Sequence, residues 1–155
     1  GSVSKHDEVE VVPAADIGVV RSLQVMDDDV ETAITGDRVG VALRNLREQS
    51  LHRGCMICIP GEGALASHGA SEFNLLKAPF QGRTLEIGEV IHAASDMQFS
   101  VGRVTGKNGN AVTVEWDSPI WIRQDGSARV MLVQLDAMPM RIIGVAEDMK
   151  PVNLV

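Results

Sequence analysis

Short runs of alternating apolar and polar residues dominate the chain, and each run predicts a β-strand with one buried face. Val39, Val41 and Leu43 alternate with small or charged residues. Near the amino end, Val9 and Val11 alternate with glutamates in the same way. Alternation over several residues is typical of a half-buried strand, because successive side chains point to opposite faces. Strands are therefore expected at 8–12 and 38–44.

Turn-forming residues separate these runs. Thr35-Gly36-Asp37 precedes the strand at 38–44, and Pro60-Gly61 ends a short apolar run at 55–59. Asn108-Gly109 predicts a hairpin turn, because Asn and Gly tolerate the positive φ angles that such a turn requires. Further strands are expected at 19–25, 70–78, 90–94, 97–105, 111–116, 129–135 and 140–147.

The composition favours an all-β protein with an aliphatic core. Apolar residues make up 45% of the 155 residues, aromatic residues make up 3%, and there is no tyrosine. Many short strands at close spacing, with few helix-period segments, are typical of barrels and sandwiches. The small and polar segment Glu62–Gly69 is a candidate linker between two domains.

The order of residue types in the first half resembles a known family. A Gly-Asp-x-Val-Gly turn and strand at 36–40 is followed by a spacer ending in Arg53-Gly54 and by an apolar strand ending in Pro60-Gly61. This order resembles the second domain of elongation factor Tu and its relatives in the translational GTPase superfamily. The resemblance is strongest to archaeal-type relatives of the selenocysteine-specific elongation factor.

The second half resembles the third domain of the same superfamily. The segment 71–76 corresponds to the first strand of that domain, and 139–144 corresponds to its closing strand. The resemblance implies two small β-barrels, a domain 2-like barrel at 1–64 that is truncated at its amino end and a domain 3-like barrel at 65–155.

The GTPase motifs of the superfamily are missing from the chain. No G-x-x-x-x-G-K-[ST] phosphate loop is present, and Gly106-Lys107 does not have the residue spacing that this motif requires. The resemblance therefore implies a non-enzymatic part without a cofactor of its own. GTP and Mg²⁺ would bind a separate GTPase domain of the full-length protein.

The amino end carries a second expectation. The family's second domain has strands ahead of the segment that corresponds to Glu8–Val12, and Gly1-Ser2 resembles a tag-cleavage remnant. We therefore expect Glu8–Val12 to present an unpaired strand edge. Such an edge would favour either a homodimer through the first domain or a poorly ordered amino end.

Charge and cysteine content limit the function further. A formal net charge of −7 argues against a free-standing nucleic-acid-binding protein, although a fragment could hold part of such a surface. No apolar run is long enough to span a membrane, no secretory signal is found, and two cysteines fit a reducing cytoplasm.

Metal and redox chemistry have little support in the sequence. Cys55 and Cys58 have the spacing of half a zinc site, but on a strand residues three apart face opposite sides. Core packing is therefore the favoured interpretation. The acidic segment 26–32 is interpreted as a solvated loop, because it lacks the residue pattern of a calcium-binding loop. The histidines are dispersed.

The resemblance implies where an aminoacyl-tRNA end would bind. Gln24, Asp27 and Arg38 correspond to positions near the terminal adenine and the amino group in elongation factor Tu. Arg38 is the strongest candidate, because a guanidinium can hold a carboxylate, a phosphate or a selenolate.

The leading hypothesis is a non-catalytic β-barrel part of a translation factor that faces tRNA or the ribosome. The alternatives are a protein–protein adaptor and a small β-barrel enzyme that uses cysteine or histidine. Binding of charged and uncharged tRNA separates the first two, and thiol reactivity tests the third.

The chain should neither bind nor hydrolyse GTP, because no segment of it can cradle the β- and γ-phosphates. Isothermal titration calorimetry of the 155-residue chain with GTP and Mg²⁺ should give no saturable heat. Stoichiometric binding would contradict the assignment to the non-GTPase domains.

Overall fold

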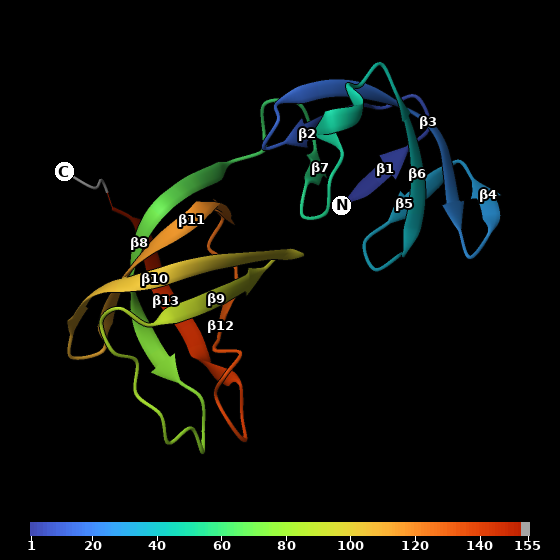
Figure 1. Ribbon diagram of the computed structural model, residues 1–155. Coiled ribbons are helices and arrows are strands. Elements are labelled where there is room, and N and C mark those ends of the chain that lie inside the picture. The colour runs from blue at the N-terminus through green and yellow to red at the C-terminus, as the bar shows by residue number, and fades with distance from the viewer. Residues whose placement is uncertain (153–155) are drawn as a thin grey trace. The chain divides into compact units, whose positions relative to one another are not determined.

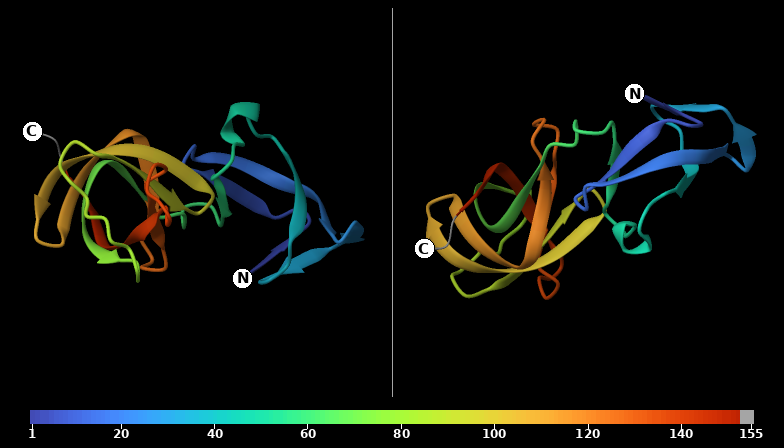
Figure 2. Two further views of the ribbon diagram at one scale, coloured as in Figure 1. Left: turned by 60° about the horizontal axis from the view of Figure 1, so that its bottom comes forward. Right: turned by 90° about the horizontal axis from the view of Figure 1, so that it is seen from above.

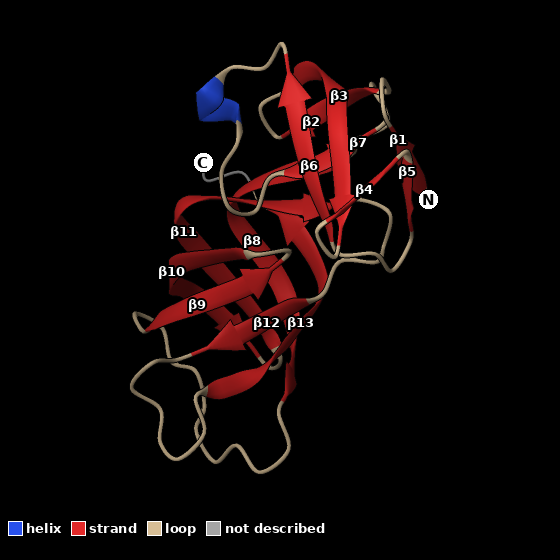
Figure 3. Ribbon diagram, turned by 90° about the vertical axis from the view of Figure 1, so that its right-hand side faces the viewer, coloured by secondary structure: helices blue, strands red, loops and turns tan. Residues whose placement is uncertain are grey.

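A computed structural model describes residues 1–152. It divides after Ala64 into two compact units, unit 1 from Gly1 to Ala64 and unit 2 from Leu65 onward. Both consist of β-strands, which confirms the all-β prediction, and one turn of 3-10 helix, η1 (Glu48–Ser50), is the helical segment drawn in Figure 3. None of the helical structure in residues 1–152 has the length and apolar character needed to span a membrane.

Unit 1 is built around a five-stranded sheet (Figure 1). The sheet has the strand order β4-β3-β2-β7, and β6 pairs with the free edge of β3. The short strands β1 and β5 form a separate two-stranded ladder. The strands are β1 (Ser2–Ser4), β2 (Glu8–Val12), β3 (Asp16–Val25), β4 (Asp28–Val30), β5 (Thr32–Ile34), β6 (Val39–Arg44) and β7 (Met56–Cys58).

The alternation that predicted β6 sets the core of unit 1. Val39, Val41 and Leu43 are half-buried and pack against the buried Val20 and Leu23 of β3. The intervening residues of β6 are exposed. The predicted face of this strand is therefore confirmed, and its opposite face is free for other contacts.

The expected unpaired edge at Glu8–Val12 is wrong. β2 pairs with β3 along one side, and its residues Glu10 to Val12 pair with β7 along the other. Val9 and Val11 are buried as a result. The chain supplies the missing neighbour from β7, which lies far from β2 in the sequence, so the physical basis for a dimer through this strand is lost.

The amino end is also ordered within unit 1. Ser2, which resembles part of a tag-cleavage remnant in the sequence, pairs with Ile34 in the β1–β5 ladder. The amino group of Gly1 donates a hydrogen bond to Oγ1 of Thr35. The first residues therefore take part in the fold.

Unit 2 is a closed barrel with the strand order β10-β11-β8-β13-β12-β9, and Figure 2 shows these strands curving around a common centre. β8 pairs with β11 along one edge and with β13 along the other. The strands are β8 (Leu65–Lys77), β9 (Val90–Ser95), β10 (Gln98–Asn108), β11 (Ala111–Arg123), β12 (Val130–Val133) and β13 (Ile142–Pro151).

Two predicted boundaries and one predicted loop need correction. The candidate linker Glu62–Gly69 is wrong beyond Ala64, because β8 begins at Leu65 and its first residues pair with the end of β11. β11 continues past Trp116 to Arg123, since Pro119 lies at a register shift where no ladder hydrogen bond is needed. The acidic segment contains the short strand β4 and is more ordered than the expected loop.

A buried polar chain crosses the core of unit 2. Nε1–H of Trp116 donates to Oγ of Ser71 at 2.8 Å, and this Oγ lies 3.1 Å from Nδ1 of His68. Trp116, Ser71 and His68 are all at most 5% exposed. The indole can only donate, and Nδ1 of His68 is the one acceptor found for the Ser71 hydroxyl proton within residues 1–152, so we assign this proton to the Ser71–His68 hydrogen bond. The neutral imidazole therefore carries its own proton on Nε2.

His68 makes the stability of unit 2 depend on pH. Burial lowers the pKa of His68 below its ordinary value of 6.5. The unfolded chain then binds a proton that the folded chain does not, so stability is complete above about pH 6.5 and falls as the pH drops toward the folded pKa. NMR titration of the His68 ring should show it still neutral below pH 6.5. A ring that titrates at or above 6.5 would contradict this expectation.

Gly144 allows β13 to approach β8. A Cβ atom at this position would lie 2.2 Å from the carbonyl oxygen of Leu76 and 3.0 Å from Cδ1 of Leu75. Gly144→Ala should therefore lower the free energy of unfolding by about 1–3 kcal/mol, as overpacked sites do. Urea denaturation measures this, and Gly82→Ala is the control, because nothing lies within 4 Å of its Cβ position. Equal effects of the two substitutions would contradict the prediction.

Candidate nucleic-acid interface

The three residues expected to hold an aminoacyl end lie at one end of the unit 1 sheet. Gln24 is the next-to-last residue of β3, Asp27 lies in the turn that leads to β4, and Arg38 directly precedes β6. Val25 at the end of β3 pairs with Val39 at the start of β6. This register brings Arg38 next to the turn, and all three side chains are exposed.

Gln24 is flanked by two different neighbours. Asp29 pairs with it on β4 and accepts a hydrogen bond from its Nε2 at 3.0 Å. Gly40 pairs with it on β6 and has no side chain. The amide of Gln24 is therefore held on the acidic side, and the surface above Gly40 is left open. Asp27 itself has a left-handed backbone conformation with φ 68.

Arg38 begins a row of exposed residues along β6. Gly40, Ala42 and Arg44 follow at alternate positions, and the burial pattern of the strand places them on its solvent side. We call the surface formed by Arg21, Gln24, Arg38, Gly40, Ala42 and Arg44 the arginine face. Arg38 and Arg44 lie about 20 Å apart along an extended strand. Small side chains between them allow an extended anionic chain to lie flat on the strand.

The arginines of this face are available to a ligand. Within residues 1–152, the ion pairs of unit 1 join Lys5 to Glu31 and Arg47 to Asp16, and none involves Arg21, Arg38 or Arg44. A guanidinium without an intramolecular partner can bind phosphate or carboxylate in a bidentate manner.

Arg44 and Arg21 were missed in the sequence analysis. Arg44 could have been found, because an even spacing from Arg38 places both side chains on one face of a strand. Arg21 could not have been found in this way, because the register of β3 shifts between Val20 and Ser22. This shift leaves Arg21 as the extra residue of a bulge. A bulge of this kind depends on the partner strand β6.

Arg47 has a structural role instead. Oδ2 of Asp16 accepts hydrogen bonds from Oγ of Ser50 at 2.6 Å, from the backbone N–H of Arg47 at 2.9 Å and from its Nε at 3.2 Å. These hydrogen bonds lower the pKa of Asp16 below its ordinary value, and the bond from Ser50 has the largest effect. They fasten η1 to the start of β3, so the chain after Arg44 has a defined path.

The two cysteines are free thiols, and the surroundings of Cys58 disfavour its thiolate. Cys55 and Cys58 are free and half-buried, and Cys58 donates a weak hydrogen bond through Sγ to the carbonyl oxygen of Glu10 at 3.5 Å. Burial, with Glu10 and Glu62 nearby, raises the pKa of the Cys58 thiol. A raised pKa disfavours the thiolate that a nucleophile or zinc ligand requires. No cluster of three or more potential metal ligands occurs in residues 1–152.

The residues present do not fit GTP. A nucleotide phosphate site at a helix N-terminus needs a glycine-rich loop that leads into a helix, whereas the helical structure of residues 1–152 is limited to the three residues of η1. Nucleotide chemistry is therefore not assigned to any of the residues 1–152.

Comparison with solved structures identifies the fold. The chain matches translation elongation factor SelB from Methanococcus maripaludis with a TM-score of 0.77 and 22% identity, over 98% of this chain and 38% of that one. The same factor with the GTP analogue GppNHp gives a TM-score of 0.76 and 23% identity. This is the fold of a part of the selenocysteine-specific elongation factors. A bacterial selenocysteine-specific factor gives 0.71 and 20% identity, over 95% of this chain and 23% of that one.

Sequence comparison agrees with the elongation-factor fold. A selenocysteine-specific elongation factor of Methanocaldococcus jannaschii is 39% identical over 57 residues, which cover 37% of this chain and 12% of the factor. The expected resemblance to these factors is thereby confirmed. An uncharacterized protein of the same organism is 31% identical over 147 residues, 95% of this chain and 46% of its own length. No family model matches the chain.

The chain spans about half the length of that uncharacterized relative, and a smaller share of each elongation factor.

Proposed function

We propose that this chain is a non-catalytic part of a cytoplasmic translation elongation factor-like GTPase, and that it faces tRNA or the ribosome. Unit 1 would be the domain 2-like barrel and unit 2 the domain 3-like barrel. GTP and Mg²⁺ would bind a GTPase domain outside the 155 residues. The elongation-factor fold and the sequence match to a selenocysteine-specific factor support the class of protein.

The observation that carries the nucleic-acid part of the proposal is the arginine face. Within residues 1–152, no ion pair involves Arg38 or Arg44, and both side chains are exposed although the chain is acidic as a whole. Phosphate binding needs cations, and Arg38 and Arg44 lie at the two ends of β6, at alternate positions that share its exposed side. Gln24 supplies an amide at the end of the same face, where a base or an aminoacyl group could be hydrogen-bonded.

The acidic turn limits how an RNA end could approach. Asp27, Asp28 and Asp29 lie beside Gln24 and are exposed. A phosphate above this turn would be repelled, so the backbone of the bound strand should follow β6 and leave β4 uncovered. Asp27 would act by excluding phosphate from that side, or by contacting an amino group.

Arg38→Ala and Arg44→Ala test this assignment in the 155-residue chain. Each should weaken binding to aminoacyl-tRNA and reduce the slope of log Kd against log salt concentration by about 1 per lost phosphate contact. The free energy of unfolding should stay within about 0.5 kcal/mol of the parent, since both sites are exposed. Filter binding at several salt concentrations, with the same tRNA before and after deacylation, provides the measurement.

Arg53→Ala is the matched control. Arg53 is exposed and precedes β7, which lies at the opposite edge of the sheet from β6. It should leave binding unchanged. No binding of tRNA by the parent chain, or equal losses in all three variants, would count against the arginine face.

A protein-binding role is the second candidate, and one observation favours it. Cross-strand pairing aligns a row of apolar residues on the outer wall of unit 2, and the row crosses the five strands β8, β13, β12, β9 and β10. Several of its side chains are more than 40% exposed, and apolar surfaces of this kind often mark protein contacts. The row consists of Leu76, Val145, Met131, Ala94 and Phe99. Absence of tRNA binding would favour this role.

A further inference from the structure

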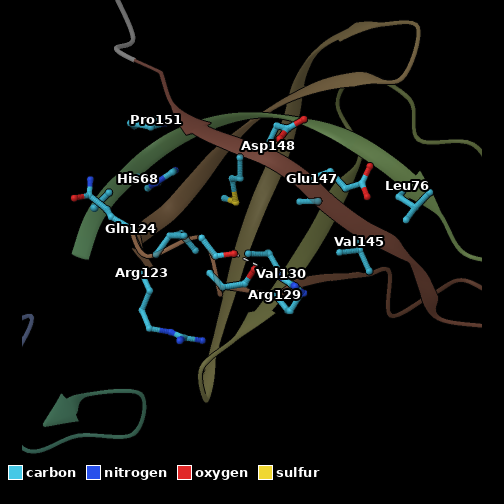
Figure 4. Close-up of a pocket in the computed structure, with 16 residues that line it drawn as sticks. His68, Leu76, Arg123, Gln124, Arg129, Val130, Val145, Glu147, Asp148 and Pro151 are labelled. Atoms are coloured by element: carbon cyan, nitrogen blue, oxygen red, sulfur yellow. Dashed lines mark hydrogen bonds between the residues drawn. The ribbon is translucent and has the colours of Figure 1, made fainter. Parts of the chain in front are cut away.

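A cavity of 780 Å³ opens at one end of the unit 2 barrel. The start of β8, the end of β11, the start of β12 and the end of β13 meet there, and the loop 124–129 crosses the opening. In Figure 4, His68 and Gln124 lie at one side of the cavity, and Val145 and Glu147 lie at the other. The mouth of a barrel is a common place for a small-molecule site, and the volume lies within the usual range.

The floor of the cavity is apolar. Ile122 and Val130 are buried in the core of the barrel, and Ala146 and Met149 pack against that core and remain half-buried. Met149 follows a bulge at Asp148, where β13 no longer keeps regular register with β8. A flexible thioether at this position can adapt to the shape of a ligand.

One buried polar group faces this floor. His68 lines the cavity and is 1% exposed. Its Nδ1 is hydrogen-bonded to Ser71, and the assignment of the Ser71 hydroxyl proton to this bond places the proton of the neutral imidazole on Nε2. No hydrogen bond from Nε2 is found within residues 1–152.

Among the charged groups that line the cavity, Arg123 is paired with a carboxylate, and the others are exposed at the rim. Arg123 is held by Asp96 through Nε–Oδ2 and Nη2–Oδ1 contacts of 2.8 and 3.0 Å. Arg129 donates to the carbonyl oxygens of Gly126 and Ala128. Glu147 and Asp148 are exposed. Burying an ion against the apolar floor would therefore cost desolvation with no buried counter-charge to offset it.

We propose that this cavity binds an uncharged, mainly apolar small molecule with one hydrogen-bond acceptor, a carbonyl oxygen or an aromatic ring nitrogen, which accepts the Nε2–H of His68. The apolar body of the ligand covers Ile122, Val130, Ala146 and Met149. This site is separate from the arginine face, and it does not depend on the function proposed for that face.

Three probes of similar size test the proposal on the 155-residue chain. N-cyclohexylacetamide is neutral and has a carbonyl acceptor, cyclohexylacetate is its anionic counterpart, and cyclohexylmethylammonium is a cation without an acceptor. In ¹H–¹⁵N NMR titrations at millimolar concentrations, the amide should give saturable shifts that cluster at residues 128–130 and 146–149. The two ions should bind at least several-fold more weakly. No clustered shifts with the amide, or equal binding of an ion, would overturn the proposal.

His68→Phe keeps an aromatic ring and removes the donor. It should raise the Kd for N-cyclohexylacetamide about threefold to tenfold, the usual effect of losing one hydrogen bond. His92→Phe is the matched control, because His92 lies in the same barrel, stacks on Phe99 at 5.0 Å and does not line the cavity. Unchanged binding in a folded His68→Phe variant would overturn the role of His68.

A second measurement does not depend on whether that variant folds. In the parent chain, ¹⁵N shifts of the His68 ring should show the tautomer protonated on Nε2. The Nε2–H proton should move downfield as the amide is added. A proton on Nδ1, or an Nε2–H signal whose chemical shift does not change as the amide is added, would contradict the assigned contact.

Discussion

The pairing of β8 along both of its edges is the interaction on which unit 2 depends. One edge joins β11 and the other joins β13, so this strand closes the barrel. Closure buries Phe73 of β8 and lets Ser71 and His68 share a polar chain with Trp116 of β11. With aromatic residues at only 3% of the chain, the core has few large side chains and relies on closed sheets to exclude water.

Local patterns in the sequence predicted most strands, and contacts between distant segments account for the errors. The alternation at Val39, Val41 and Leu43 was sufficient to place β6 and its buried face, because one-sided burial is a local property. The unpaired edge expected at Glu8–Val12 failed, since its neighbour β7 comes from residues 56–58. No local pattern reports which distant strand will fill an edge.

The residues of the candidate sites likewise fall into two groups, those that could be predicted from the sequence and those that depend on contacts between distant segments. Arg38 was named from its resemblance to a family position, and Arg44 follows from strand periodicity once β6 is known. Arg21 depends on a bulge, and His68 depends on Ser71 and on Trp116, which lies across the barrel on β11. Nothing in the residues around His68 indicates that its proton is fixed on Nε2. A donor of this kind is visible only when the three side chains are placed together.

The pairing of β8 with β13 also bears on how the chain folds as it is made. Lys77 pairs with Gly144 and Ser71 pairs with Pro151. The first strand of the barrel can therefore pair along this edge only after the last strand has been synthesised. During synthesis from the amino end, unit 1 has all of its strands before β9 is made, whereas the second edge of β8 stays open until β13 leaves the ribosome. Non-local pairing of this kind slows folding and exposes apolar strands in the interval. The glycine at position 144 thus lies in the segment that completes the barrel, where the last strand must fit against a wall already in place.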